Sequence, residues 1–191
     1  DPRKAAMTLE DLLTMRSGLD WNEMISYDDA SNSCIQLEAS DDWIRFVLDH
    51  PMREDPGTVF DYNSGVSVLL GKIVGVATGQ RVDHWAEERL FTPIGITDYH
   101  WKTTPRGEVD TEGGLYLSAH DLARIGYCML RNGKWNERQV IPEWFVEQTA
   151  QPTHGVKTPE LRFKVPAETF SHGWELPARL TGEGGTPSGK G

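Results

Sequence analysis

The fold is decided by the stretch Pro56-Gly57-Thr58-Val59-Phe60-Asp61-Tyr62-Asn63-Ser64-Gly65, which runs directly into an apolar segment that ends at Gly79. Apolar residues of this segment recur on one helical face, at Val66, Leu69, Leu70, Ile73, Val74 and Ala77. The pattern predicts a helix over residues 63–78, with Gly79 as its stop. Because the internal glycines at positions 65, 71 and 75 cost helix propensity, we expect this helix to be central and closely packed.

Other helices are predicted on both sides of this one, over residues 8–17, 40–50, 82–91, 118–132 and from 142. Thr8 and Asp11 form a capping signal, and Ser40 is expected to cap the second of these helices. The helix from Ser118 carries an apolar stripe of Leu122, Ile125, Met129 and Leu130. The sequence therefore predicts a helical lobe over residues 1–150, mostly α with minor β. Residues 151–191 are rich in Pro and Gly and hold one alternating run, Leu161–Val165, that is typical of a strand.

Composition excludes several classes of function. The 191 residues carry 19 Lys+Arg and 29 Asp+Glu, a formal net charge of −10. A chain this acidic, without a basic cluster, is not expected to bind nucleic acid, because that affinity depends on neutralising phosphates. No apolar run approaches the roughly 20 residues that a membrane-spanning helix needs, so no membrane span is predicted.

The side chains that commonly bind metals show no metal-binding spacing. Cys34 and Cys128 are too few for a disulfide framework, and two free or buried thiols are expected rather than a bridge between them. The histidines show no HExxH-like pattern, and the adjacent pairs Asp28-Asp29 and Asp41-Asp42 suit helix starts better than an acid/base pair. No metal site is predicted.

Tyr62 stands at the N-terminal edge of the central helix. The positive end of the helix dipole favours a phenolate there, although a catalytic Tyr also needs a neighbouring cation to be useful at neutral pH. The alternative is a half-buried aromatic ring whose hydroxyl has a backbone partner. The local pattern alone favours that alternative.

A resemblance to a known family changes this balance. The stretch "PGTVFDYNSG…LLGKIVGVATGQ" resembles the second signature of the serine β-lactamase-like hydrolases. This superfamily includes class C β-lactamases, D-Ala-D-Ala peptidases, esterases and 6-aminohexanoate-oligomer hydrolases. Further similar blocks occur along the chain in the family's order. One precedes the signature, "LEDLLTMRSGLDW", and four come after it, "ERLFTPIGITDYHW", "GGLYLSAHDLARIGYCMLRNGKW", "QVIPEWF" and "HGWEL". Together they cover most of residues 8–176.

The resemblance implies a mechanism and assigns two residues to it. Tyr62 takes the general acid/base role in cleaving an amide or ester through an acyl-serine, without metal or organic cofactor. Ser64 stands where Asn is common, and is expected to be a hydrogen-bonding neighbour at the cleft. The implied substrate is a small-molecule amide or ester: a β-lactam, a peptide or a small ester. The "YNSG" form is closer to the esterase-like and oligomer-hydrolase-like members.

The family's nucleophile motif, Ser-x-x-Lys, does not occur in this sequence, so no nucleophile is assigned to it. We therefore expect the chain to be the helical lobe of a β-lactamase/transpeptidase-like α/β fold, lacking most of the central sheet and inactive alone. The alternative hypothesis is a non-catalytic helical module that acts only in association, through an uncovered apolar face. The family resemblance favours a periplasmic or secreted location.

Overall fold

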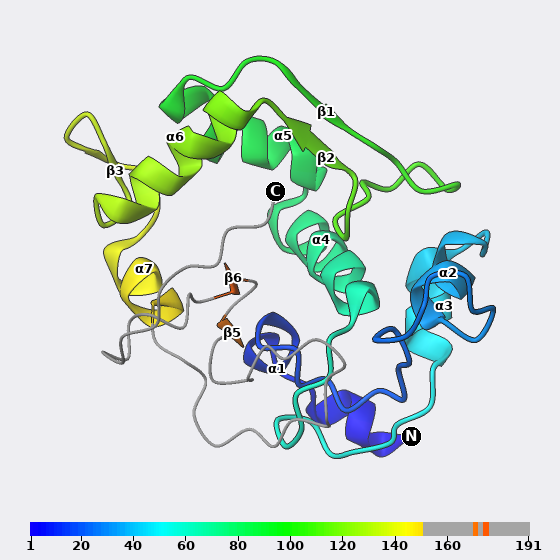
Figure 1. Ribbon diagram of the computed structural model, residues 1–191. Helices are drawn as coiled ribbons and strands as arrows, with labels where there is room; N and C mark the ends of the chain where they lie inside the picture. The colour runs from blue at the N-terminus through cyan, green and yellow to red at the C-terminus, as the bar shows by residue number, and fades with distance from the viewer. Residues whose placement is uncertain (151–169, 172–173, 176–191) are drawn as a thin grey trace, which may run out of the picture.

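The computed structural model of the chain describes residues 1–150, 170–171 and 174–175 (Figure 1). Its helices are η1 (Pro2–Ala6), α1 (Leu9–Leu13), α2 (Ser33–Glu38), α3 (Trp43–Asp49), α4 (Ser64–Thr78), α5 (Val82–Ala86), η2 (Glu87–Phe91), η3 (Thr92–Ile94), α6 (Ala119–Leu130) and α7 (Glu143–Thr149). Three antiparallel two-stranded sheets pair β1 (Tyr99–Trp101) with β2 (Leu115–Leu117), β3 (Lys134–Trp135) with β4 (Arg138–Gln139), and β5 (Phe170–Ser171) with β6 (Trp174–Glu175).

This part of the chain is mostly helical with short strands, as the sequence predicts. The expected strand over Leu161–Val165 lies outside the described residues. The absence of most of a central sheet stays a prediction.

Helix α4 is the centre of the fold, as its glycines indicate. It contacts α1, α2, α3 and α5, and Figure 1 shows these helices arranged around it. Asn63 caps its first turn, because Oδ1 accepts a hydrogen bond from the backbone N–H of Val66 at 3.1 Å. Gly79 ends it with a φ of 71°.

At two of the internal glycines of α4, other parts of the chain lie too close to leave room for a Cβ without a shift. A Cβ at position 65 would lie 2.7 Å from Cγ2 of Val47 and 2.9 Å from Cη2 of Trp21. A Cβ at position 71 would collide with the side chain of Thr111, whose hydroxyl donates to the carbonyl of Ser67 at 2.8 Å. Close packing is therefore the reason that α4 tolerates residues of low helix propensity.

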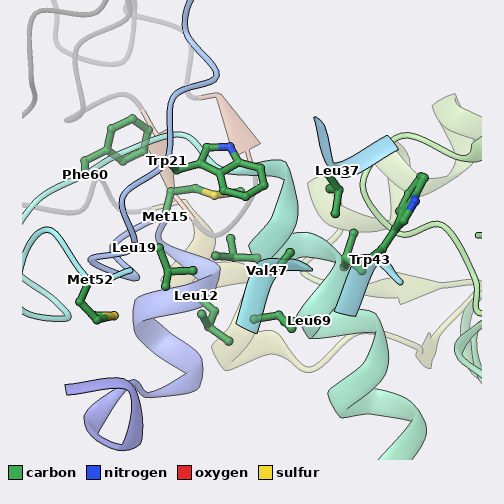
Figure 2. Packing of buried hydrophobic residues seen from close by; sticks show 12 residues of the cluster. Leu12, Met15, Leu19, Trp21, Leu37, Trp43, Val47, Met52, Phe60 and Leu69 are labelled. Carbon is green, nitrogen blue, oxygen red and sulfur yellow. The ribbon is translucent and has the colours of Figure 1, made fainter. Parts of the chain in front are cut away.

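The buried apolar residues form two clusters. The larger lies around the N-terminal half of α4 and includes Leu12, Met15, Leu19, Trp21, Leu37, Trp43, Val47, Met52, Phe60 and Leu69 (Figure 2). The smaller consists of Ala86, Phe91, Ile94, Ile96 and Cys128, and joins α5, η2 and η3 to α6. The candidate site lies at the edge of the larger cluster.

Two sequence predictions are corrected here. Ser40 does not cap a helix: its hydroxyl donates to the carbonyl of Leu37 at 2.8 Å in the turn after α2, a helix that the sequence did not predict. Asp42 caps α3 instead, accepting from the backbone N–H of Arg45 at 3.0 Å. The cap of α3 is therefore the residue directly before Trp43, the first apolar residue of the helix.

The second correction concerns α6. Leu122 and Leu130, predicted members of its apolar stripe, are 58% and 80% exposed. Cys128 is fully buried instead, and Ile125 packs against the smaller cluster. The buried face of α6 is therefore rotated from the face that side-chain hydrophobicity alone indicates. The capping signal at Thr8 with Asp11 is confirmed, although α1 ends at Leu13, earlier than predicted, and Ser118 caps α6.

Candidate active site

Tyr62 and Ser64 flank the residue that caps α4, so the start of this helix places both. Tyr62 is partly buried and packs against the larger core cluster. Ser64 is the first helical residue and is 6% exposed. Between them, Asn63 is buried, and its Nδ2 has no hydrogen-bond partner among the described residues.

A buried carboxylate holds the first turn of α4. Glu23 is 3% exposed, and its Oε1 accepts a hydrogen bond from the hydroxyl of Ser64 at 2.5 Å. Its Oε2 accepts from the backbone N–H of Ser64 at 2.8 Å and from the indole Nε1 of Trp21 at 2.7 Å. A carboxylate at a helix N-terminus is favoured by the helix dipole, and here three donors satisfy its oxygens. The hydroxyl of Ser64 thus faces Glu23.

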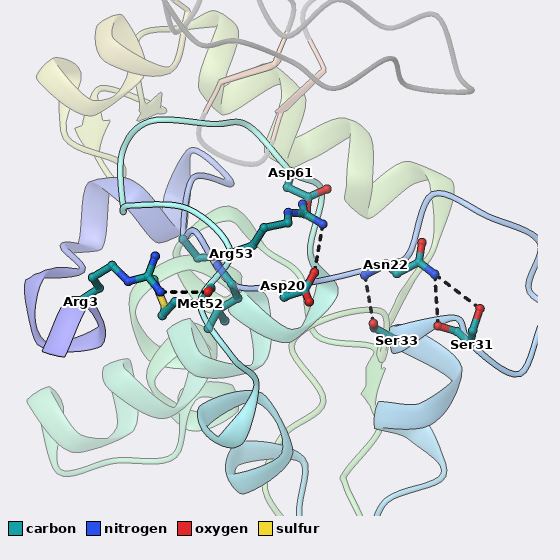
Figure 3. Close-up of polar contacts among 10 residues, drawn as sticks. Arg3, Asp20, Asn22, Ser31, Ser33, Met52, Arg53 and Asp61 are labelled. Atoms are coloured by element: carbon teal, nitrogen blue, oxygen red, sulfur yellow. Dashed lines mark hydrogen bonds and ion pairs between the residues drawn. The ribbon is translucent and has the colours of Figure 1, made fainter. Parts of the chain in front are cut away.

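The segment that carries Glu23 is itself fixed against α2. Nδ2 of Asn32 donates to the carbonyl of Glu23 at 3.1 Å, while Oδ1 of Asn32 accepts from the backbone N–H of Cys34 at 2.9 Å. The backbone N–H of Asn22 donates to Oγ of Ser33 at 3.0 Å (Figure 3). Glu23 therefore joins the start of α2 to the start of α4.

Burial raises the pKa of the Tyr62 phenol above its usual value. The Glu23 carboxylate raises it next, and Tyr27, Glu112 and Cys34 add to the rise. This direction is opposite to the one that the helix dipole alone suggests, because desolvation and nearby acids both disfavour the phenolate. Tyr62 is therefore a neutral phenol in this chain, suited to donate a proton.

An acidic cluster lies next to the site. Sγ of Cys34, a carboxylate oxygen of Glu38 and one of Glu112 lie within 4.8 Å of one another. Burial and, after it, neighbouring acids including Glu23 raise the pKa of the Cys34 thiol to about 12 and that of Glu112 to about 7. These three groups are the ones in the described part of the chain that could hold a metal ion. A search for spacing along the sequence missed them because Glu112 comes from a distant loop.

Asp61, directly before Tyr62, belongs to a separate charged group. Arg53 lies between Asp20 and Asp61 and forms an ion pair with each (Figure 3). Burial nevertheless raises the pKa of Asp61 to about 6, against the lowering effect of Arg53.

Three tryptophans and the two cysteines lie in the interior of the described residues or pack against it. Trp21 is 1% exposed and belongs to the core, and Trp101 and Trp135 pack against the smaller cluster. Cys34 and Cys128 are both buried and unbridged, as expected. No helix in the described residues is long and apolar enough to cross a membrane.

The sequence matches the Beta-lactamase family over residues 1–189, and the chain belongs to that family. No curated protein sequence matches it.

Solved structures agree with this family. A protein assigned as a 6-aminohexanoate-dimer hydrolase from Bacillus anthracis is 25% identical, with a TM-score of 0.66 over 75% of the chain. A protein assigned as a β-lactamase from Bacteroides dorei is 21% identical, with a TM-score of 0.71 over 95% of the chain. A penicillin-binding protein from Bacillus halodurans is 17% identical, with a TM-score of 0.57 over 78%. The chain spans 41%, 56% and 54% of their respective lengths.

Proposed function

We propose that this chain is the helical part of a serine hydrolase that cleaves an amide or ester through an acyl-serine intermediate, with Tyr62 as its general acid/base. The observation that carries the proposal is the placement of Tyr62 beside the Glu23–Ser64 pair, in a chain of the Beta-lactamase family. The 6-aminohexanoate dimer named for the 25% identical relative, whose two units are joined by an amide bond, supports an amide among the substrates.

The proposed reaction has two stages. The serine hydroxyl gives its proton to a base as Oγ attacks the carbonyl carbon, the C–N or C–O bond breaks, and the leaving nitrogen or oxygen takes a proton from Tyr62. Water then attacks the acyl-serine ester and returns a proton to Tyr62, and the protonated base returns a proton to the serine as the acid is released. Because Tyr62 is neutral at physiological pH, we assign it the proton donated to the leaving group.

The nucleophile is proposed to come from outside these 191 residues. None of their serines is followed by lysine at the third position. In the Ser-x-x-Lys motif, the lysine would bring a cation to the acidic surroundings of Tyr62 and offset the charge of the phenolate that forms when the proton leaves. By the same family resemblance, we propose a periplasmic or secreted location.

The test is the Tyr62→Phe variant of the complete enzyme. Losing a general acid costs on the order of 10²–10⁴-fold in turnover, so kcat should fall by about that factor while the folded state persists. Tyr127→Phe is the matched control, since Tyr127 is 51% exposed on α6 and is not among the groups that raise the pKa of Tyr62. Unchanged kcat in Tyr62→Phe would contradict the assignment.

A second candidate function is association between copies of the chain. Several large apolar side chains on α6 and α7 are exposed, among them Leu122, Leu130 and Trp144. Such a face favours contact with another protein surface. Sedimentation velocity over a range of concentrations should then show association that Leu130→Glu weakens, whereas a monomer at every concentration would argue against it.

A further inference from the structure

We propose that Glu23 is a positioning residue for Tyr62: its carboxylate holds Ser64 in the first turn of α4 and so fixes the phenol at the candidate site. The inference rests on the function proposed above, since it concerns the geometry that the acid/base step needs. It adds a residue that lies 41 positions from Ser64 in the sequence and outside the signature that identifies the family.

The geometry makes Glu23 the connection between three parts of the chain. Oε2 binds both the backbone N–H of Ser64 and the indole of Trp21, and Oε1 binds the Ser64 hydroxyl. Trp21 in turn packs closely over Gly65, where an added Cβ would lie 2.9 Å from its Cη2. The backbone of residues 63–65 is therefore fixed by Asn63 within α4, by Glu23 through hydrogen bonds and by Trp21 through packing. Tyr62 is the next residue along this fixed backbone.

Two variants separate the hydrogen bonds that the Glu23 side chain makes from the charge that it carries. In Glu23→Gln, the amide oxygen can accept the two N–H donors that Oε2 accepts, and the amide NH₂ can donate to the Ser64 hydroxyl, which rotates to accept. That variant keeps the positions and removes the charge. Glu23→Ala removes both and leaves buried donors without partners.

The effect of the Glu23 charge is measured by the pKa of Tyr62, and the effect of Glu23 on the position of Tyr62 is measured by kcat. Burial raises the pKa of Tyr62 most, and the side chains of Glu23, Tyr27, Glu112 and Cys34 raise it further. Removing the Glu23 charge should therefore lower the pKa of the Tyr62 phenol. A displaced phenol should instead lower kcat, because misplacing a catalytic group by about 1 Å costs on the order of 10²-fold.

The first experiment titrates the full chain labelled with [¹³Cζ]tyrosine by NMR, with Tyr62→Phe to assign the Tyr62 signal. In Glu23→Gln the Tyr62 phenol should titrate at lower pH than in the unsubstituted chain, while Tyr127 does not shift. Glu88→Gln, which removes an exposed carboxylate on η2, should leave the Tyr62 titration unchanged. An unshifted Tyr62 in Glu23→Gln would show that the Glu23 charge does not lie close to the phenol, and this would contradict the geometry from which the proposal is argued.

The second experiment measures kcat, KM and the pH profile of the complete enzyme. Glu23→Ala should lower kcat by about 10²-fold with a smaller change in KM, and Glu23→Gln should restore most of that kcat with a shifted pH profile. Ser64→Ala, which removes one of the three hydrogen bonds, should fall between them. If Glu23→Ala keeps the kcat of the unsubstituted enzyme, or if Glu23→Gln is no better than Glu23→Ala, the positioning role is wrong.

The two proposals can fail separately. Unchanged kcat in Tyr62→Phe would remove the proposed function itself. If Tyr62→Phe loses kcat while the Glu23 variants do not, only the positioning role fails.

Discussion

The hydroxyl of Ser64 lies 2.5 Å from Oε1 of Glu23, a carboxylate with 3% of its surface exposed. This pair fixes the residue two positions after Tyr62 to the segment that carries Glu23 and that also contains Trp21 of the larger core cluster. Leaving such buried donors unpaired costs on the order of 1–3 kcal/mol, so the pair constrains the start of α4. Tyr62 is therefore held in place by the protein interior.

The first prediction concerns Glu112 and pH. Its folded-state pKa, about 7, lies above the usual value of 4.5 for a glutamate, so the folded state binds its proton more tightly than the unfolded state. The stability this provides is complete below pH 4.5 and is lost as pH rises through 7. With allowance for solvent screening, the loss is about 2 kcal/mol.

Urea unfolding at pH 4.5 and pH 7 checks this. Glu112→Gln should be less sensitive to pH between these values than the unsubstituted chain, while Glu88→Gln should not differ from it. A Glu112→Gln variant with the same change in unfolding free energy between the two pH values would contradict the prediction.

The second prediction tests the packing at the start of α4. Gly65→Ala places a methyl group within 3 Å of Val47 and Trp21, and overpacking of this kind costs about 1–3 kcal/mol. Gly126→Ala is the matched control, because that glycine is exposed within α6 and its Cβ would meet nothing within 4 Å. We expect Gly126→Ala to stabilise the chain by about 0.5–1 kcal/mol and Gly65→Ala to destabilise it. Equal melting temperatures for the two variants would count against close packing at position 65.

The third prediction concerns the thiols. Burial raises the pKa of Cys34 to about 12 and also raises that of Cys128, and the thiolate is the reactive form. Iodoacetamide at pH 8 should therefore label neither thiol in the folded chain and both in urea, as read by intact mass. Rapid labelling of the folded chain would contradict the burial of these groups, and absence of labelling in urea would indicate a bridge.

The central helix could be predicted because its information is local. The apolar period from Val66, the cap at Asn63 and the stop at Gly79 all lie within one segment. The short hairpin of β1 and β2 could not, since three residues from Tyr99 to Trp101 are too few to show an alternating pattern.

Only two residues of the candidate site, Tyr62 and Ser64, could be predicted from the sequence. Tyr62 and Ser64 carry a family signature, but Glu23 follows Trp21 and Asn22 in a segment with no periodicity or motif. Its role arises when α2 and α4 bring distant segments together. The same holds for Glu112, which lies 74 residues from Glu38 in sequence and within 4.8 Å of its cluster partners in space. A pKa direction likewise depends on burial, which outweighs the tendency of a helix N-terminus to favour a phenolate.

The most direct test of the account is intact mass after exposure to a serine-directed acylating probe. On the 21.5 kDa chain alone we expect no adduct, because it has no Ser-x-x-Lys motif. On the complete enzyme we expect one adduct, formed more slowly in the Tyr62→Phe variant. An adduct on the 191-residue chain, or equal rates with and without the Tyr62 hydroxyl, would contradict the proposed mechanism.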